Sequence, residues 1–128
     1  MPLARIALAA GKSKDYRRAL TDGVQRALVE TFNVPADDQF MLLNEYQPDD
    51  FVYNRTYLGI ERSDDFVVIQ LTVSNTRTLA QKQALYRRIV EVLAERPGLR
   101  KQDIFINLVE VLPENWSFGL GEAQYVSR

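Results

Sequence analysis

The hydrophobic residues of this chain follow the period of a strand and then the period of a helix. Residues 2–9 alternate weakly between apolar and polar positions, which predicts a strand. From Tyr16 onward the apolar positions recur every three to four residues, as on one face of a helix, and Ser13 is the predicted N-cap. Asn33 suits a left-handed helix cap, and Pro35 prevents the helix from continuing.

The second half of the chain repeats this order. Phe40 to Tyr46 predicts a second strand, and a polar, turn-rich stretch follows it. Residues 66–73 form a near-continuous apolar run that is typical of the interior of a sheet. Thr78, with Gln81 three residues later, forms a capping box ahead of a second helix, which ends at Pro97-Gly98.

A fourth strand and a short tail complete the chain. Residues 104–111 predict the strand, and residues 116–119 and 123–126 predict short strands or a hairpin. From Ser13 to Phe118 the two halves match without a gap at a constant interval of 65 positions. The identical pairs include Ala19/Ala84, Leu20/Leu85, Leu28/Leu93, Asp38/Asp103, Phe40/Phe105, Leu43/Leu108, Glu45/Glu110 and Pro48/Pro113.

We interpret this match as a duplicated β-α-β unit, with copies at about residues 2–57 and 66–118 of one domain that spans residues 1–128. The predicted fold class is therefore α/β (α+β). Each unit has parallel strands joined by a right-handed crossover, so two units form a four-stranded sheet with both helices on one face. The other face keeps apolar positions, which predicts a closed homo-oligomer that buries them.

Composition narrows the possible chemistry. The 128 residues include no His and no Cys, which excludes disulfides and thiol catalysis and argues against a bound metal. With 16 basic and 17 acidic residues the net charge is -1. The chain lacks the excess of positive charge that is typical of nucleic-acid-binding proteins. No apolar run is long enough for a membrane span and no signal peptide precedes the first strand, so we expect a cytoplasmic protein.

The second residue is the strongest candidate for chemistry. Removal of Met1 would leave Pro2 as a free secondary amine at the head of a strand. Because the chain has no His or Cys, the α-amino group is the remaining class of group with an ordinary pKa near neutrality. Pro2 can therefore act as an acid or base at pH 7. The alternative is an ordinary proline near a frayed terminus.

With Pro2 at the head of a duplicated β-α-β chain, the sequence resembles the tautomerase superfamily, and within it the malonate semialdehyde decarboxylase branch. The resemblance covers nearly the whole chain. The matching segments are Pro2, Phe32 to Asp38, Leu58-Gly59-Ile60-x-Arg62, Arg77 with Ala80-Gln81-Lys82, and Asn115-Trp116-Ser117-Phe118-Gly119 followed by Ala123-Gln124. The last of these is the most specific.

The resemblance implies a trimer of duplicated β-α-β chains that needs no cofactor or metal. It implies that Pro2 lies in an apolar pocket at a subunit boundary, that Arg77 binds the carboxylate of a small substrate and that Asp38 assists. It also implies an aromatic wall of Trp116, Phe118 and Tyr125. One position departs from the pattern, because the decarboxylase has Arg-x-Arg where this chain has Asn75-Thr76-Arg77. Arg77 alone can still bind a carboxylate through two hydrogen bonds, and Asn75 is a further substrate-binding candidate.

Two chemical regimes are open for Pro2. A neutral amine, favoured by an apolar pocket and by Arg77, would act as a base in keto-enol tautomerisation of a 2- or 3-oxo carboxylate. A cationic amine, favoured by Asp38, would promote loss of carbon dioxide from a 3-oxo acid, or addition of water. The sequence alone does not decide whether Asp38 or Arg77 has the larger effect on the pKa of the Pro2 amine.

Each candidate also has a structural interpretation. Arg77 could be a solvated loop residue, and Asp38 could share a turn role with its counterpart Asp103. Trp116 and Phe118 could be core or interface aromatics. Two β-α-β units also fit a non-catalytic, ferredoxin-like module that binds a small ligand or drives assembly. Such a module would tolerate Met1, whereas catalysis by the Pro2 amine would not.

Overall fold

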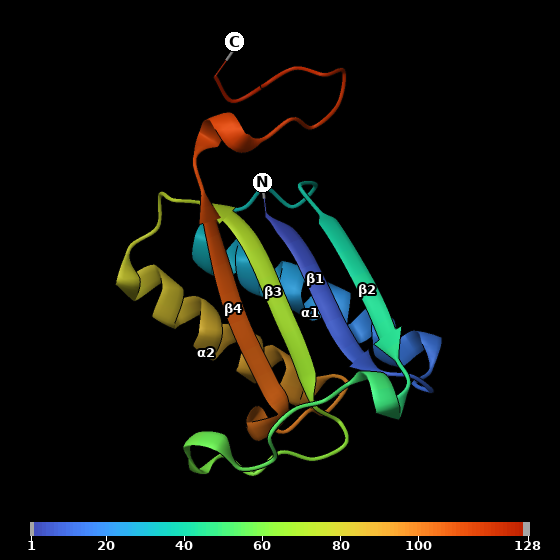
Figure 1. The fold of residues 1–128 in the computed structure, drawn as a ribbon. Helices are drawn as coiled ribbons and strands as arrows, with labels where there is room; N and C mark the ends of the chain where they lie inside the picture. Colours follow the sequence, from blue (N-terminus) through green and yellow to red (C-terminus); the bar gives the residue numbers. More distant parts are fainter. Residues whose placement is uncertain (1, 127–128) are drawn as a thin grey trace.

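The structure is a computed structural model that describes residues 2–126, and its elements follow the predicted order. They are β1 (Leu3–Ala9), α1 (Lys14–Phe32), β2 (Phe40–Tyr46), β3 (Val67–Ser74), α2 (Leu79–Glu95) and β4 (Ile104–Val111). The four strands form one sheet in the order β2-β1-β3-β4, and both helices cover the same face of it (Figure 1). The predicted duplicated β-α-β fold is confirmed. Within residues 2–126, neither helix is both long and apolar enough to cross a membrane.

The direction of the strands decides which segments meet. β1 runs parallel to β2, and β3 runs parallel to β4, whereas the two central strands β1 and β3 are antiparallel, with Leu3 opposite Thr72. The start of β1 therefore lies beside the end of β3, at the same end of the sheet as the end of β4. The segment after β4 rises from this same end of the sheet (Figure 1).

The core lies between the sheet and the helices. Ile6, Ile69, Leu20 and Leu85 are completely buried there, one from each central strand and each helix. The helices approach closely at Gly23, where a Cβ atom would lie 2.7 Å from Cδ2 of Leu93. A Cβ at this position would force the side chains of Leu93 and Val92 to move, so the close helix crossing favours glycine.

The duplication extends to individual contacts at the interval of 65 residues. The N–H of Val34 donates to the carbonyl of Leu28, and the N–H of Leu99 donates to that of Leu93. The remaining equivalent pairs are the caps Ser13 and Thr78, the ion pairs Arg17–Glu45 and Lys82–Glu110, and the short 3-10 turns Pro48–Asp50 and Pro113–Asn115. The two halves are therefore the same unit in structure as well as in sequence.

The predicted strands of the C-terminal tail were wrong. Residues 116–126 form no strand; after the turn at Pro113–Asn115 they form further turns. Gly119, Leu120 and Gly121 have φ angles of 142°, 62° and 68°, which interrupt an extended chain. The amide of Gln124 then closes the turn, accepting from the N–H of Phe118 at 2.9 Å and donating to the carbonyl of Gly119 at 2.7 Å.

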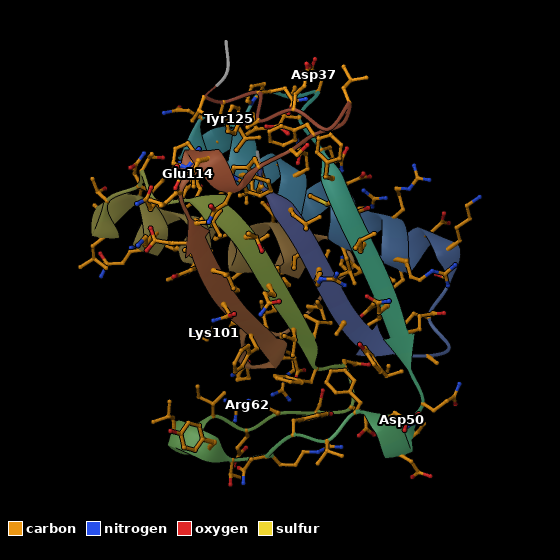
Figure 2. The ribbon with its side chains drawn as sticks, turned by 45° about the horizontal axis from the view of Figure 1, so that its top comes forward. Asp37, Asp50, Arg62, Lys101, Glu114 and Tyr125 are labelled. Carbon is orange, nitrogen blue, oxygen red and sulfur yellow. The ribbon has the colours of Figure 1, made fainter. Side chains whose placement is uncertain are left out.

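The connection between the two units, residues 47–66, lies at the other end of the sheet. Figure 2 shows Arg62 and Asp50 far from Tyr125 and Glu114. One guanidinium nitrogen of Arg62 donates to the carbonyls of Asn54, Tyr57 and Ile60 at 3.1–3.4 Å. Because a single side chain satisfies several carbonyls, this long connection has a defined shape.

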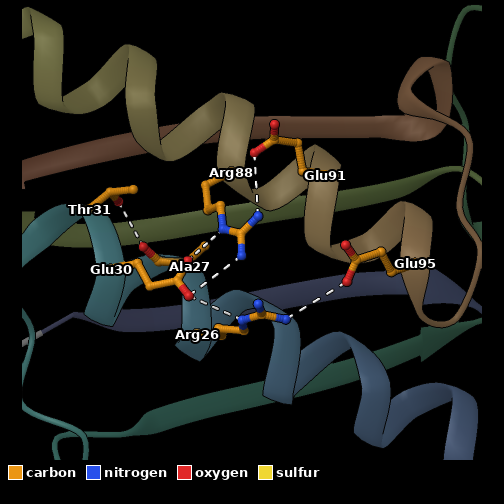
Figure 3. A network of polar contacts seen from close by, with 7 residues as sticks. All are labelled: Arg26, Ala27, Glu30, Thr31, Arg88, Glu91 and Glu95. Atoms are coloured by element: carbon orange, nitrogen blue, oxygen red, sulfur yellow. Dashed lines mark hydrogen bonds and ion pairs between the residues drawn. The ribbon is translucent and has the colours of Figure 1, made fainter.

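A cluster of charges joins the outer faces of the helices (Figure 3). The Glu30 carboxylate of α1 accepts from Arg88 of α2 and, at 3.1 Å, from Arg26 of α1. Arg88 also reaches Glu91 at 3.5 Å, and Arg26 reaches Glu95 at 3.8 Å. The hydrogen bonds from Arg88 and then Arg26 lower the pKa of Glu30 below its ordinary value of 4.5.

The lowered pKa of Glu30 predicts a pH-dependent contribution to stability. A depressed folded pKa stabilises the fold above the ordinary value of 4.5, and the contribution is lost as the pH falls through the folded pKa. We expect Glu30→Gln to lower the midpoint of thermal unfolding at pH 7 and to lose this difference from the wild type in acid. Glu122→Gln, which removes the same charge on an exposed turn, is the control. An equal difference between E30Q and wild type at pH 7 and pH 3 would contradict the prediction.

Candidate active site

A small apolar pocket lies at the start of β1. Its volume is about 210 Å³, and Pro2, Leu3, Phe40, Trp116, Ser117 and Phe118 line it. Pro2 is buried, and Leu3 is paired with Phe40 at the start of the parallel strand β2. The volume is below the range of about 300–1,000 Å³ for drug-sized ligands, so the pocket suits a molecule of a few carbon atoms.

Aromatic rings form one side of this pocket. The ring of Phe118 stacks on Trp116 at a centroid distance of 5.4 Å with an angle of 8° between the planes. Tyr125 meets Phe118 edge-on at 4.9 Å, and Phe40 lies 6.2 Å from it. The structure thus brings the three predicted wall residues together next to Pro2. The indole N–H of Trp116 donates to Oγ of Ser74, at the end of β3, over 3.1 Å.

The side chain of Arg77 is held by contacts within the protein instead of extending into solvent. Its guanidinium donates to the carbonyl of Phe32 at 2.7 Å and to Oγ1 of Thr76 at 3.1 Å, and it lies 4.9 Å from the centre of the Phe32 ring. Burial lowers the pKa of Arg77, and the nearby Tyr125 opposes this shift. Because the Phe32 ring and carbonyl fix it at the carboxyl end of β3, the cation is oriented before any ligand binds.

Tyr125 lies within electrostatic range of both Asp38 and Arg77. Partial burial raises the pKa of the Tyr125 phenol, the negative charge of Asp38 raises it further, and Arg77 lowers it. Asp38 comes from the turn before β2, Arg77 from the turn after β3 and Tyr125 from the C-terminal segment. Three segments distant in sequence therefore place an anion, a cation and a phenol at one end of the sheet.

The duplicated aspartates have different surroundings. Asp103 is completely buried, and its carboxylate accepts from the N–H of Ser63 at 2.7 Å and from its hydroxyl at 2.6 Å. Arg100 lies 3.6 Å from the same carboxylate. Asp38 is half-buried and lies at the end of the sheet that carries the pocket. The predicted shared turn is present in both halves, because the N–H of Asp38 donates to the carbonyl of Pro35 and the N–H of Asp103 donates to that of Arg100, each at 3.0 Å. The side chains differ: that of Asp103 contacts the 47–66 connection, whereas that of Asp38 lies within electrostatic range of Tyr125.

Asn75 lies in the same turn as Arg77, but not in the pocket wall. Its side chain is exposed, and its backbone N–H donates to the carbonyl of Val111 at 2.9 Å. Phe40 and Ser117 also line the pocket, but the sequence did not single them out as site residues. The predicted parallel pairing of the first two strands could have pointed to Phe40, because it places the first residues of both strands side by side.

The pocket has a chemically different counterpart in the second repeat. The residue equivalent to Pro2 is Val67, a buried strand residue whose nitrogen is locked in a peptide bond. In the first repeat, an amine at this place would require removal of Met1, which lies outside the described residues. Among residues 2–126 no three His, Cys, Asp or Glu side chains gather as metal ligands.

Comparisons with known proteins agree with this fold. Two family profiles, both described as tautomerase enzyme, match residues 38–119 and 2–59. The chain is 38% identical over 126 residues to the probable tautomerase YusQ of Bacillus subtilis (strain 168), covering 98% of this chain and 99% of YusQ. The protein belongs to the tautomerase family of enzymes.

Several solved structures are similar to this chain along nearly its whole length. FG41 malonate semialdehyde decarboxylase inhibited by 3-bromopropiolate superposes with a TM-score of 0.91 at 40% identity, over 97% of this chain and 94% of that one. A second malonate semialdehyde decarboxylase gives a TM-score of 0.90 at 30% identity, over 96% and 95% of the two chains. A fused 4-OT symmetric trimer shares the fold at 17% identity, with a TM-score of 0.80 over 98% and 99%.

The two aspartates provide a matched pair of variants. We expect Asp103→Asn to destabilise the fold by about 1–3 kcal/mol, because a buried carboxylate that accepts two hydrogen bonds from Ser63 is replaced by an amide. We expect Asp38→Asn to lower the turnover of folded enzyme, because it removes the negative charge near Tyr125. Chemical denaturation and steady-state kinetics measure the two effects. Equal destabilisation by both variants, with equal loss of turnover, would contradict the division of roles.

Proposed function

We propose that this protein is a cofactor-independent enzyme that uses the amine of Pro2, freed by removal of Met1, on a small 2- or 3-oxo carboxylate. One observation carries the proposal: Pro2 is buried in an apolar pocket lined by Trp116 and Phe118, at the end of the sheet that carries Arg77. The amine supplies acid-base chemistry and Arg77 supplies a site for the carboxylate. The pocket volume of about 210 Å³ suits such a substrate.

In the tautomerase reaction, Pro2 acts as a base. The apolar lining and the positive charge of Arg77 both favour the neutral amine. The amine accepts a proton from the enol hydroxyl or from the carbon beside the carbonyl, and the same proton is returned at the other position. No bond other than those to hydrogen changes, so no cofactor is needed. The apolar wall keeps water away from the enol during the transfer.

The decarboxylase reaction uses the protonated amine. Asp38 favours the cation, which hydrogen-bonds the carbonyl oxygen of a 3-oxo acid. The bond between the carboxylate carbon and its neighbour then breaks, carbon dioxide leaves, and the electron pair moves toward the carbonyl to give an enol. A proton on carbon completes the product. The 40% identity with a malonate semialdehyde decarboxylase supports this branch, and Asn75 in place of a second arginine supports the tautomerase branch.

The exposed face of the sheet supports a closed homo-oligomer, which we propose is a trimer. Phe40 and Leu42 of β2 are 52% and 46% exposed, and Phe105 and Val109 of β4 are 47% and 38% exposed, all on the face that the helices leave open. A face of this kind is buried against other subunits in soluble proteins. The oligomer buries Phe40, so it also shapes the pocket that this residue lines.

The Pro2 amine can be tested directly. We expect the intact mass to lack Met1, and Pro2→Ala to lower kcat for phenylenolpyruvate ketonisation by about two orders of magnitude, because the substitution replaces a secondary amine fixed by its ring with a primary amine that the pocket no longer positions. Pro48→Ala, at the opposite end of the sheet, is the control. Retained Met1 with full activity, or equal rates for P2A and wild type, would overturn the proposal. The pH profile distinguishes tautomerisation by the neutral amine from decarboxylation by the protonated amine. If the neutral amine is the active form, enzyme activity rises with pH; if the protonated amine is the active form, activity falls with pH.

Arg77 is tested by a variant that keeps its charge. Arg77→Lys retains a cation but loses the planar pair of donors that matches a carboxylate. We expect KM to rise about tenfold, which corresponds to about 1.4 kcal/mol of binding energy, with a smaller effect on kcat. Arg55→Lys, in an exposed ion pair with Asp64 on the far connection, is the matched control. An unchanged KM for R77K would exclude Arg77 as the carboxylate ligand.

A further inference from the structure

Ser74 joins the two parts of the proposed site. It is the last residue of β3, its side chain is 3% exposed, and the turn that carries Arg77 follows it directly. Its Oγ accepts the indole N–H of Trp116 over 3.1 Å, across 42 residues of sequence. The hydroxyl therefore connects the turn with the carboxylate-binding cation to the segment with the aromatic wall.

The orientation of Trp116 determines the shape of the wall. Trp116 is stacked face to face on Phe118, and both rings line the pocket with Pro2. Residues 116–126 belong to no strand, Phe118 is 38% exposed and Trp116 is half-buried, so neither a strand nor full burial in the core holds these rings. The hydrogen bond that Trp116 donates to a buried hydroxyl at the end of a central strand is a fixed point for this segment.

The first repeat does not contain this contact. The residues 65 positions earlier are Ala9 and Phe51, which carry neither the hydroxyl nor the indole N–H. Both members of the pair therefore differ together between two otherwise equivalent units. Phe51 instead packs in an all-aromatic cluster with Tyr46, Tyr53 and Phe66 at the end that has no amine. A contact required only by the β-α-β scaffold would be expected in both repeats.

We propose that Ser74 is a positioning residue for the proposed reaction: its hydroxyl fixes the indole of Trp116 and thereby holds the wall of the Pro2 pocket. The inference rests on the proposed function for its catalytic consequence, but not for its structural one. Ser74 lines no part of the pocket described above, so it acts through Trp116. Loss of its hydroxyl loosens the surface that contacts the substrate and leaves Pro2 and Arg77 in place.

The first test is Ser74→Ala, with Thr21→Ala as a control that removes a hydroxyl bonded to the Arg18 carbonyl on α1. We expect KM to rise about threefold to tenfold, the equivalent of one neutral hydrogen bond, while kcat changes less than about twofold. Trp116 is the only tryptophan in the chain, so its fluorescence reports on the wall alone. We expect S74A to increase acrylamide quenching and to shift the emission maximum, and T21A to change neither.

The second test is a double-variant cycle. Trp116→Phe alone leaves the Ser74 hydroxyl buried without its donor, whereas S74A combined with W116F reproduces the alanine and phenylalanine of the first repeat. We expect both single variants to lower the unfolding midpoint and the double variant to recover part of the loss, while KM stays raised. If S74A does not fold, Ser74→Cys, with its weaker acceptor, is expected to show the same changes at smaller size.

The outcomes separate this inference from the proposed function. Unchanged quenching and unchanged KM in S74A, or strictly additive losses of stability in the cycle, would overturn the role of Ser74. Ketonisation by wild type that does not depend on Pro2 would overturn the proposed function. In that case quenching and the stability cycle still decide whether Ser74 positions the indole, because neither measurement requires turnover.

Discussion

The antiparallel pairing of β1 with β3 is the constraint on which the candidate site depends. Each β-α-β unit is parallel within itself, so the two units can share one sheet only through this central pair. With Leu3 opposite Thr72, the start of the chain lies beside the end of β3. The turn after β3 carries Arg77, and β4, parallel to β3, delivers Trp116 to the same end. A shift in this register would separate Pro2 from both Arg77 and Trp116.

The two ends of the sheet show how a duplicated unit can serve two purposes. At the far end Lys12, the counterpart of Arg77, is paired with Asp65 at 2.5 Å, and Tyr53 stacks on Phe66 at 4.3 Å. Asp103 there holds the connection between the units through Ser63. Equivalent positions thus close one end with internal contacts, and at the other end they surround a pocket. The two ends differ at equivalent positions, where Pro2 lies in the pocket and Val67 is an internal strand residue.

Local signals explain what the sequence could predict. The caps at Ser13 and Thr78, and the strand ending at Tyr46, depend on neighbouring residues and were read correctly. The tail was not, because its turns depend on left-handed backbone at residues 119–121 and on the side chain of Gln124. Asp38 and Asp103 are indistinguishable by position in the repeat. Their surroundings are separated by tertiary partners such as Ser63, which no local pattern reveals.

The location of Pro2 and the C-terminal segment at one end of the sheet has a practical consequence for handling the protein (Figure 1). A peptide appended ahead of Pro2 acylates its nitrogen, and a peptide appended beyond Tyr125 emerges beside the aromatic wall. Affinity handles and fluorescent fusions at either end are therefore not neutral. The connection at residues 47–66, on the opposite side and shaped by its own hydrogen bonds, offers exposed positions such as Val52 for a label that leaves the pocket untouched.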